Sequence, residues 1–361
     1  METSEIIDVP CPISENSLAG WHLQLKRIEK RNFGLITLRF LYDDSSKDHD
    51  NHNKNNLLKS IRYSIKTSLQ IRKNKTTKVL FPSFWLPNVL LFFILPSYAK
   101  KIIRISGQEL FPGNPLSFLL RRYALKKSEL IITLNRNHYD RALVLGVDKS
   151  KVVLIPNPVG PQFVPPTIDQ RRAAREALYI ESDEFTVGCI GALCERKQQK
   201  LIIEAVARSG IKNIKVILTG RDAVETAHRN QQSYGVACKQ LASRLGVRLL
   251  LTGHREDVLP IFWALDVFVM PSLREGMPNA LLEALGCGLT CIATDIPGNV
   301  DVRERGGDIS LISTGDVKSL AEAIRDAEAI SSKKSNVVAD SLPIEFRNQA
   351  NKIFVERILS L

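Results

Sequence analysis

The 361-residue sequence has no paired cysteine motif and no long hydrophobic run. Its six cysteines, at positions 11, 189, 194, 238, 287 and 291, form no CxxC pair, so we expect neither a zinc site nor a disulfide framework. The most apolar run, VLLFFIL at 89–95, is far shorter than the roughly 20 residues that a membrane-spanning helix needs. The acidic start METSEIIDVP does not resemble a secretory signal. These absences together predict a cytoplasmic protein.

Acidic residues are scarce in the first half of the chain. Residues 1–163 hold 25 Lys and Arg against 13 Asp and Glu, whereas residues 164–361 hold 25 of each kind. The whole net charge of +12 therefore comes from the first half. Such charge suits nucleic acid, an anionic membrane or an anionic substrate, because each presents closely spaced negative groups. No aromatic-rich basic motif or helix-turn-helix accompanies it, so we expect no nucleic-acid partner.

Short β-branched runs alternate with amphipathic segments in the first half. This alternation predicts a largely parallel sheet with helices on both faces. The expected strands are 6–9, 33–42, 78–81, 101–106, 130–134 and 152–155. The expected helices are 18–30, 57–74, 86–95, 115–127 and 136–145, and the polar stretch 43–56 predicts a mobile loop.

The second half repeats the pattern after a Pro-rich stretch, PNPVGPQFVPP at 156–166, which predicts an interdomain linker. The expected strands are 185–190, 215–219, 248–252, 266–270 and 290–294. The expected helices are 197–209, 231–245, 258–263 and 279–285. Each of these strands leads into a Gly-containing or polar loop. In an open α/β sheet, the carboxyl ends of the strands are where ligands bind.

The segment PSLREGMPNALLEA at 271–284 is the most specific one. Glu275 is expected in a loop after a strand, Pro278 suits the first turn of a helix, and Glu283 lies deeper in that helix. Glu275 can accept hydrogen bonds from sugar hydroxyls, and Glu283 can hold a ribose diol. Alternatively, Glu275 is an ordinary loop residue and Glu283 a charge on the helix surface. The amides expected at the positive end of the helix dipole, a place that suits a diphosphate, are those of Gly276, Met277 and Asn279.

This segment resembles the E-x7-E signature of retaining GT-B glycosyltransferases, often called family four. Similar pieces occur in the family's order: GCIGALCERKQQKLIIEAV at 188–206, VILTG at 216–220, and the stretch 251–302. The resemblance implies an α/β GT-B fold, with two Rossmann-like domains whose parallel sheets face each other across a cleft. It implies an acceptor-side domain at 1–163, a nucleotide-sugar-binding domain at 164–340, and a last helix at 341–361 that crosses back to the first domain.

The resemblance also implies roles for single residues. Lys197 would reach the donor diphosphate and offset the charge that grows on the leaving group. Arg196 would supply the cation that the family usually carries directly after Gly191, where this chain has Ala192. His254 would lie against the nucleotide base. The expected catalytic residues are thus Glu275, Lys197 and Arg196, and the expected donor-binding residues are Gly191, His254, Gly276, Met277, Asn279 and Glu283.

The implied reaction moves a sugar from a nucleotide-sugar donor to a saccharide or lipid-linked acceptor with retention of anomeric configuration. Its setting would be the synthesis of cell-surface polysaccharide or glycolipid. We expect no metal, because Lys197 and the helix amides can meet the diphosphate charge, and no cofactor, because the nucleotide-sugar is a co-substrate. Two departures, Ala192 and a serine at Ser106 in place of a family histidine, keep open a catalytically impaired binding subunit of a glycosylation complex. A nucleotide-sugar epimerase is a further alternative.

The expected helix 57–74 combines basic and apolar residues at helical spacing. Its basic residues are Lys59, Arg62, Lys66, Arg72 and Lys73, and its apolar residues include Leu57, Leu58, Ile61, Ile65 and Leu69. This pattern predicts peripheral contact with an anionic membrane, at the inner face of the cell membrane. Alternatively, the apolar face packs on the sheet and the lysines are only solvated.

Overall fold

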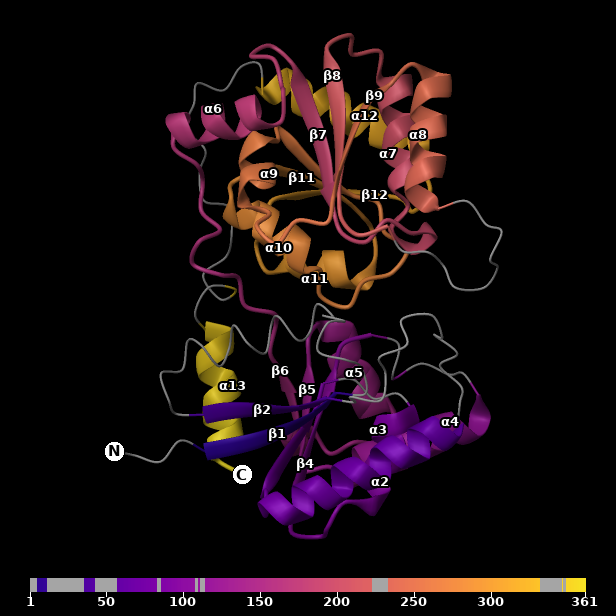
Figure 1. Cartoon of the computed structure of the whole chain (residues 1–361), viewed down its shortest axis with the longest axis vertical. Coiled ribbons are helices and arrows are strands. Elements are labelled where there is room, and N and C mark those ends of the chain that lie inside the picture. Colours follow the sequence, from indigo (N-terminus) through magenta and orange to yellow (C-terminus); the bar gives the residue numbers. More distant parts are fainter. Residues whose placement is uncertain are drawn as a thin grey trace. The chain divides into compact units, whose positions relative to one another are not determined.

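The computed structural model describes residues 5–11, 36–42, 57–82, 86–107, 110, 114–222, 233–331, 346 and 349–361. It divides into two compact units, drawn in Figure 1: Met1–Pro158 together with Asn348–Leu361, and Val159–Arg347. The division falls inside the Pro-rich stretch, whereas the sequence predicts it after residue 163. The expected helix 18–30 and the polar loop 43–56 lie outside the described residues.

The first unit contains a parallel six-stranded sheet with the order β2-β1-β3-β4-β5-β6. Its strands are β1 (Glu5–Cys11), β2 (Ile36–Tyr42), β3 (Lys78–Phe81), β4 (Lys100–Ile105), β5 (Leu130–Thr133) and β6 (Val152–Leu154). Its described α-helices are α2 (Leu57–Asn74), α3 (Leu86–Ile94), α4 (Pro115–Lys127), α5 (Arg136–Val144) and α13 (Gln349–Leu359). Caps explain where α4 and α5 begin, because the side chains of Asn114 and Asn135 accept hydrogen bonds from backbone amides three residues later.

The two faces of this sheet carry different helices. Val79 and Phe81 of β3 belong to one buried cluster with residues of α2, α3, α4 and α5. Leu80, between them, belongs to a second cluster, in which Phe354 and Ile358 of α13 cover the sheet. Successive side chains of a strand point to opposite faces, so helices cover both sides of the sheet, as the sequence predicts.

The second unit contains another parallel six-stranded sheet, with the order β12-β11-β10-β7-β8-β9. Its strands are β7 (Phe185–Ile190), β8 (Ile214–Thr219), β9 (Arg248–Gly253), β10 (Val267–Met270), β11 (Thr290–Thr294) and β12 (Ile309–Ile312). Its described α-helices are α6 (Ile168–Ala177), α7 (Gln199–Ser209), α8 (Tyr234–Leu245), α9 (Leu259–Ala264), α10 (Asn279–Gly286), α11 (Pro297–Glu304) and α12 (Val317–Ser331). The strands predicted from β7 to β11 are confirmed, whereas the sequence analysis names no element for α6, α11, β12 or α12.

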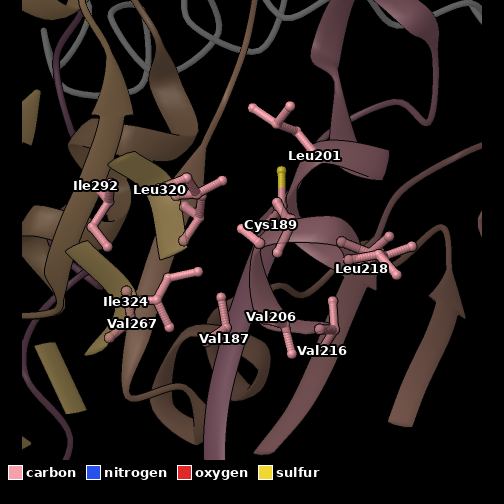
Figure 2. Close-up of a cluster of buried hydrophobic side chains, with 14 of the residues drawn as sticks. Val187, Cys189, Leu201, Val206, Val216, Leu218, Val267, Ile292, Leu320 and Ile324 are labelled. Atoms are coloured by element: carbon pink, nitrogen blue, oxygen red, sulfur yellow. The ribbon is translucent and has the colours of Figure 1, made fainter. Parts of the chain in front are cut away.

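A hydrophobic cluster fills the space between this sheet and the helices α7, α8 and α12 (Figure 2). Val187 and Cys189 of β7, Val216 and Leu218 of β8, and Leu320 of α12 all belong to it. Each large apolar side chain that is fully buried contributes roughly 1.5–3 kcal/mol. The cluster therefore anchors the strands whose carboxyl ends carry the loops of the site.

Two glycine turns meet at those carboxyl ends. Gly191 N, after β7, donates to Thr219 O at 2.8 Å, and Gly220 N, after β8, donates to Gly253 O at 2.9 Å. Gly220 has a φ of +156°, and a Cβ atom built on it would lie 1.9 Å from Gly191 O. Only glycine fits at position 220, because the two turns approach this closely.

Candidate active site

Glu275 lies in the loop after β10, and two basic side chains contact the same oxygen of its carboxylate. Lys197 Nζ is 2.7 Å from Glu275 Oε1, and Arg196 Nη1 donates to Oε1 at 3.0 Å. The side chains of Lys197 and Glu275 are 13% and 12% exposed, whereas that of Arg196 is 40% exposed. The fold thus brings together three residues that the sequence analysis selects. We call Arg196, Lys197 and Glu275 the ionic cluster.

Opposing effects set the pKa of Glu275. Burial raises the pKa of this carboxyl group, because a low-dielectric surrounding penalises the charged form. The positive charges of Lys197 and Arg196 outweigh burial and hold the pKa of Glu275 below its ordinary value of 4.5. Glu275 is therefore ionised at neutral pH. Two cations face one carboxylate, so the ionic cluster has one positive charge in excess.

The turn after β7 positions Lys197. This lysine ends a single 3-10 turn (Glu195–Lys197) that precedes α7. The sequence predicts that Lys197 begins the long helix, but α7 begins at Gln199, so that prediction is wrong. A Cβ atom built on Gly191 would be 3.3 Å from Lys197 Cε, so Gly191 lies directly against the lysine side chain. Gln199 closes the turn by donating from Nε2 to Ala192 O at 2.9 Å. A larger residue at position 191 would displace the lysine side chain.

Arg196 connects this turn to the loop after β10. Its carbonyl oxygen accepts a hydrogen bond from Leu273 N at 2.9 Å, and its Nη1 donates to Arg274 O at 2.9 Å. Ala192, the position where the resemblance predicts a cation, is exposed. The second cation at Glu275 therefore comes from Arg196, which also fixes the spacing of the two loops.

A second set of contacts, which the sequence analysis misses, holds the Glu275 loop from the β11 side. Thr294 Oγ1, at the end of β11, donates to Ser272 O at 2.6 Å, and Asn299 Nδ2 donates to Thr294 O at 2.8 Å. Gly298 packs directly on the loop, because a Cβ atom built on it would lie 2.6 Å from Gly276 O. The only signal for these contacts is the polar, Gly-containing stretch TDIPGN that follows a predicted strand.

Helix α10 begins beside the ionic cluster. Pro278 is its N-cap residue and Asn279 its first residue, and Gly276 and Met277 come directly before them, as the sequence predicts. Glu283 lies in the second turn of α10 and is only 7% exposed. The alternative interpretation of Glu283 as a surface charge is therefore wrong. The role of Glu283 toward a ribose stays a prediction.

His254 and Asp266 lie away from the ionic cluster. His254 is exposed and directly follows β9, an edge strand of the sheet. Asp266 precedes β10, so it lies at the opposite end of that strand from Glu275. Its carboxylate accepts hydrogen bonds from Arg171 Nη2 at 2.6 Å and Thr186 Oγ1 at 2.7 Å. These contacts join α6 to the sheet and give Asp266 a structural role.

Comparisons with known proteins find similar glycosyltransferases. The family model of glycosyl transferases group 1 matches residues 184–328. UDP-Gal:alpha-D-GlcNAc-diphosphoundecaprenol alpha-1,3-galactosyltransferase of Escherichia coli is 33% identical over 186 residues, 50% of this chain and 46% of that protein. The capsular polysaccharide biosynthesis glycosyltransferase CapM of Staphylococcus aureus is 26% identical over 196 residues, 54% of this chain and 48% of CapM. The chain thus spans about half the length of these curated relatives.

Solved structures match the fold of the whole chain. The structure of HepE from Anabaena, in complex with UDP and glucose, has a TM-score of 0.78 and 17% sequence identity, and covers 99% of this chain and 100% of its own. At this identity the likeness shows the fold alone, which is the GT-B fold with its two parallel sheets. The segment that matches the family model contains the complete ionic cluster. The chain therefore has the GT-B fold, and its residues 184–328 are similar to the glycosyl transferases group 1 family.

Proposed function

We propose that this protein is a glycosyltransferase that moves a sugar from a nucleotide-sugar donor to a saccharide or lipid-linked acceptor. The ionic cluster carries the proposal, because Lys197 and Arg196 converge on Glu275 Oε1 at the carboxyl ends of β7 and β10. Its excess positive charge suits the diphosphate of a donor. Its carboxylate suits the hydroxyl groups of the donor sugar.

Lys197 is the residue that we assign to the diphosphate. Its side chain is mostly shielded from solvent, so its charge is screened less than that of an exposed lysine. On donor binding, phosphate oxygens would join Glu275 as partners of Lys197, and the lysine would offset the charge that grows on the leaving phosphate. Arg196 would serve as the second cation, and the N-terminal end of α10 would add a partial positive charge. These groups offset the diphosphate charge without a metal ion.

The order of strands suits an extended nucleotide. Neighbouring strands lie about 4.8 Å apart, so the end of β9 is roughly 10 Å from the end of β7 along the sheet edge. We place the base near His254, which follows β9, and the diphosphate near Lys197, which follows β7. Glu283 would bind the ribose hydroxyls. Glu275 would hold the donor sugar.

Retention requires the acceptor to approach from the face that the phosphate leaves. In this mechanism the bond between the anomeric carbon and the phosphate oxygen breaks, and the bond to the acceptor oxygen forms. The acceptor proton passes to the leaving phosphate, which therefore acts as the base. Glu275 is a poor nucleophile here, because two cations stabilise its charge on one oxygen. It instead orients the sugar.

The names of the relatives suggest the class of acceptor. The Escherichia coli relative uses UDP-Gal and a sugar attached to diphosphoundecaprenol, and CapM acts in capsular polysaccharide biosynthesis. We therefore propose a UDP-sugar donor and a lipid-diphosphate-linked saccharide acceptor. The product would belong to a cell-surface polysaccharide or glycolipid.

A panel of donors and acceptors tests the proposal. The purified chain is incubated with UDP-galactose, UDP-glucose or UDP-N-acetylglucosamine and with polyprenyl-diphosphate-linked N-acetylglucosamine, with and without EDTA. We expect a new α-glycosidic bond, identified by the NMR coupling of the anomeric proton, that forms equally well in EDTA. Binding of UDP without any transfer would favour a binding subunit instead. An epimerised donor would favour the epimerase.

A further inference from the structure

Helix α2 of the first unit exposes an apolar stripe. Ile61, Ile65 and Leu69 are 37, 50 and 61% exposed, and their spacing of four residues places them on one side of the helix. The opposite side packs on the sheet through Tyr63 and Ile71. The alternative that the apolar face simply packs on the sheet is therefore wrong for the three exposed residues. The side chains of residues 57–60 lie outside the described set.

A second apolar stripe lies on α4, and α3 connects the two. Leu116, Leu119 and Tyr123 of α4 are 66, 58 and 54% exposed, at spacings of three and four. Phe93 of α3, itself 43% exposed, stacks on the Tyr123 ring at a centroid distance of 5.9 Å. On its other side α3 contacts α2, because the carbonyl oxygen of Ile94 accepts hydrogen bonds from Ser68 and Arg72 of α2. The exposed apolar residues of α2, α3 and α4 thus form one surface, which we call the three-helix face.

The three-helix face is surrounded by positive charge. Helices α2, α3 and α4 contain no Asp or Glu, and the longer stretch 51–128 holds 15 Lys and Arg against one acidic residue, Glu109. The exposed basic residues on these helices are Arg62, Lys66, Arg72 and Lys73 of α2 and Arg122, Lys126 and Lys127 of α4. The Lys127 ammonium lies 5.8 Å from the centre of the Tyr123 ring. Charge and apolar area therefore occupy the same surface.

We propose that the three-helix face docks on an anionic lipid bilayer, with its apolar stripes in the interface and its basic residues on the headgroups. An exposed apolar patch marks a protein or a membrane partner, and the surrounding charge favours the membrane. Protein interfaces are poor in lysine at their centres, whereas lysine, arginine and tyrosine are favoured at headgroup level. Among the helices that the structure describes, none is long and apolar enough to cross a bilayer. Attachment by this face is therefore peripheral.

The docking proposal rests on the proposed function in one respect, since a lipid-linked acceptor is presented at a membrane surface. Vesicle binding is measured on the full chain without donor or acceptor. Transfer to a soluble saccharide acceptor is measured separately. Vesicle binding without transfer would overturn the proposed function alone, and transfer without vesicle binding would overturn the docking face alone.

The charge of the face is tested by a triple variant, Arg62→Gln, Lys66→Gln and Lys73→Gln. Each basic residue near an anionic leaflet contributes about 1 kcal/mol, so we expect the variant to bind phosphatidylglycerol vesicles about 100-fold more weakly. Binding should also weaken at high salt and be much weaker on phosphatidylcholine vesicles. The matched control is a triple variant with the same charge change at exposed helix positions of the second unit: Arg208→Gln, Lys239→Gln and Arg244→Gln. Equal loss in both variants would overturn the assignment to this face.

The apolar stripes are tested by the double variant Leu69→Asn and Leu119→Asn. Both positions are exposed, so the fold is expected to tolerate the change, and circular dichroism checks this. Val144→Asn, at a position 72% exposed on α5, is the control for an apolar residue outside the face. We expect at least a tenfold loss of vesicle binding for the double variant and none for Val144→Asn. If only the charge variant lost binding, the face would bind soluble polyanions, and the membrane proposal would be wrong.

Discussion

Lys197 Nζ lies 2.7 Å from Glu275 Oε1, although the two residues are far apart in the sequence. The contact exists because β7 and β10 are adjacent parallel strands, so the loops after them meet at one edge of the sheet. The lysine cation also lowers the pKa of the Glu275 carboxyl group. One ion pair therefore joins the two loops of the candidate active site.

Replacing Glu275 by glutamine is expected to lower transfer sharply. The variant loses a charged hydrogen-bond acceptor at the donor sugar, which commonly costs about 1.5–3 kcal/mol, or roughly ten- to a hundredfold in rate. Steady-state kinetics with a UDP-sugar donor measures the loss. Glu283→Gln is expected to weaken donor binding, because we assign that residue to the ribose.

The control for these two variants is Glu322→Gln, at an exposed position of α12 that lies outside the ionic cluster. It should transfer at the wild-type rate. Near-wild-type transfer by both Glu275→Gln and Glu283→Gln would refute their assignment to the donor. A loss of stability with unchanged kinetics would show that the two glutamates are structural.

Replacing Lys197 by alanine should weaken binding of UDP far more than binding of uridine, because the lysine is assigned to the phosphates. Arg196→Ala should have a smaller effect on UDP, since the arginine side chain is three times as exposed as that of Lys197, 40% against 13%. Calorimetry with UDP and uridine measures both variants. A silent Lys197→Ala beside a severe Arg196→Ala would show that the diphosphate lies on the arginine side of the cluster.

Acid should remove the contribution of Glu275 to stability. In the folded chain the pKa of Glu275 lies below its ordinary value of 4.5, whereas in the unfolded chain it returns to about that value. A group with a lowered folded pKa stabilises the protein above its unfolded pKa, and this contribution is lost as the pH falls below 4.5 through the folded pKa. We expect the difference in unfolding free energy between wild type and Glu275→Gln to shrink over that range. Urea titrations at several pH values measure it, and a difference that grew in acid would contradict an ionised Glu275.

Much of the fold follows from local sequence pattern. The predicted helices 57–74 and 115–127 have the observed bounds, because each has a helical apolar pattern and α4 also has a cap and a proline at its start. The strand 185–190 also has the predicted bounds. All its residues are buried, and it ends directly before Gly191. These signals lie within single segments, so no tertiary contact is needed to read them.

Tertiary contacts decide what the sequence could not predict. The start of α7 shifts past Lys197 because a separate turn, held by Gln199 and Ala192, precedes the helix. The support of the Glu275 loop by Thr294 depends on the pairing of β10 with β11, and local sequence pattern does not specify which strands pair. The burial of Glu283 likewise reflects the packing of α10 in the folded unit, whereas its sequence pattern also fits a surface charge.

Asp266→Asn should lower stability but not nucleotide binding. The carboxylate accepts hydrogen bonds from Arg171 and Thr186 at the end of β10 that is remote from Glu275, and its loss leaves the arginine without a charged partner. The pair is partly exposed, so we expect a loss of about 2 kcal/mol in the free energy of unfolding. Urea unfolding measures it, with Asp169→Asn, an exposed partner of Arg172, as the near-silent control. A large loss of UDP affinity in Asp266→Asn would contradict its structural role.

Gly220→Ala should damage both stability and donor binding, because it separates the two glycine turns at the carboxyl ends of β7 and β8. The new Cβ atom would lie 1.9 Å from Gly191 O and 3.2 Å from Ala192 N, so the Gly191 turn must move. That turn lies against Lys197, and its movement would carry the lysine away from Glu275. We expect a loss of about 3 kcal/mol in unfolding free energy from the forced overlap, together with weaker binding of UDP.

The control for Gly220→Ala is Gly210→Ala, which separates backbone strain from collision. Gly210 also has a positive φ, +75°, but a Cβ atom built on it has nothing within 4 Å. Its substitution by alanine should cost only the left-handed strain, about 1 kcal/mol, and leave the dissociation constant of UDP unchanged. Urea unfolding and UDP calorimetry on both variants give the comparison. If Gly220→Ala bound UDP as tightly as Gly210→Ala, the turn at Gly191 would not position Lys197 for the diphosphate, and the donor would have to bind elsewhere on the sheet edge.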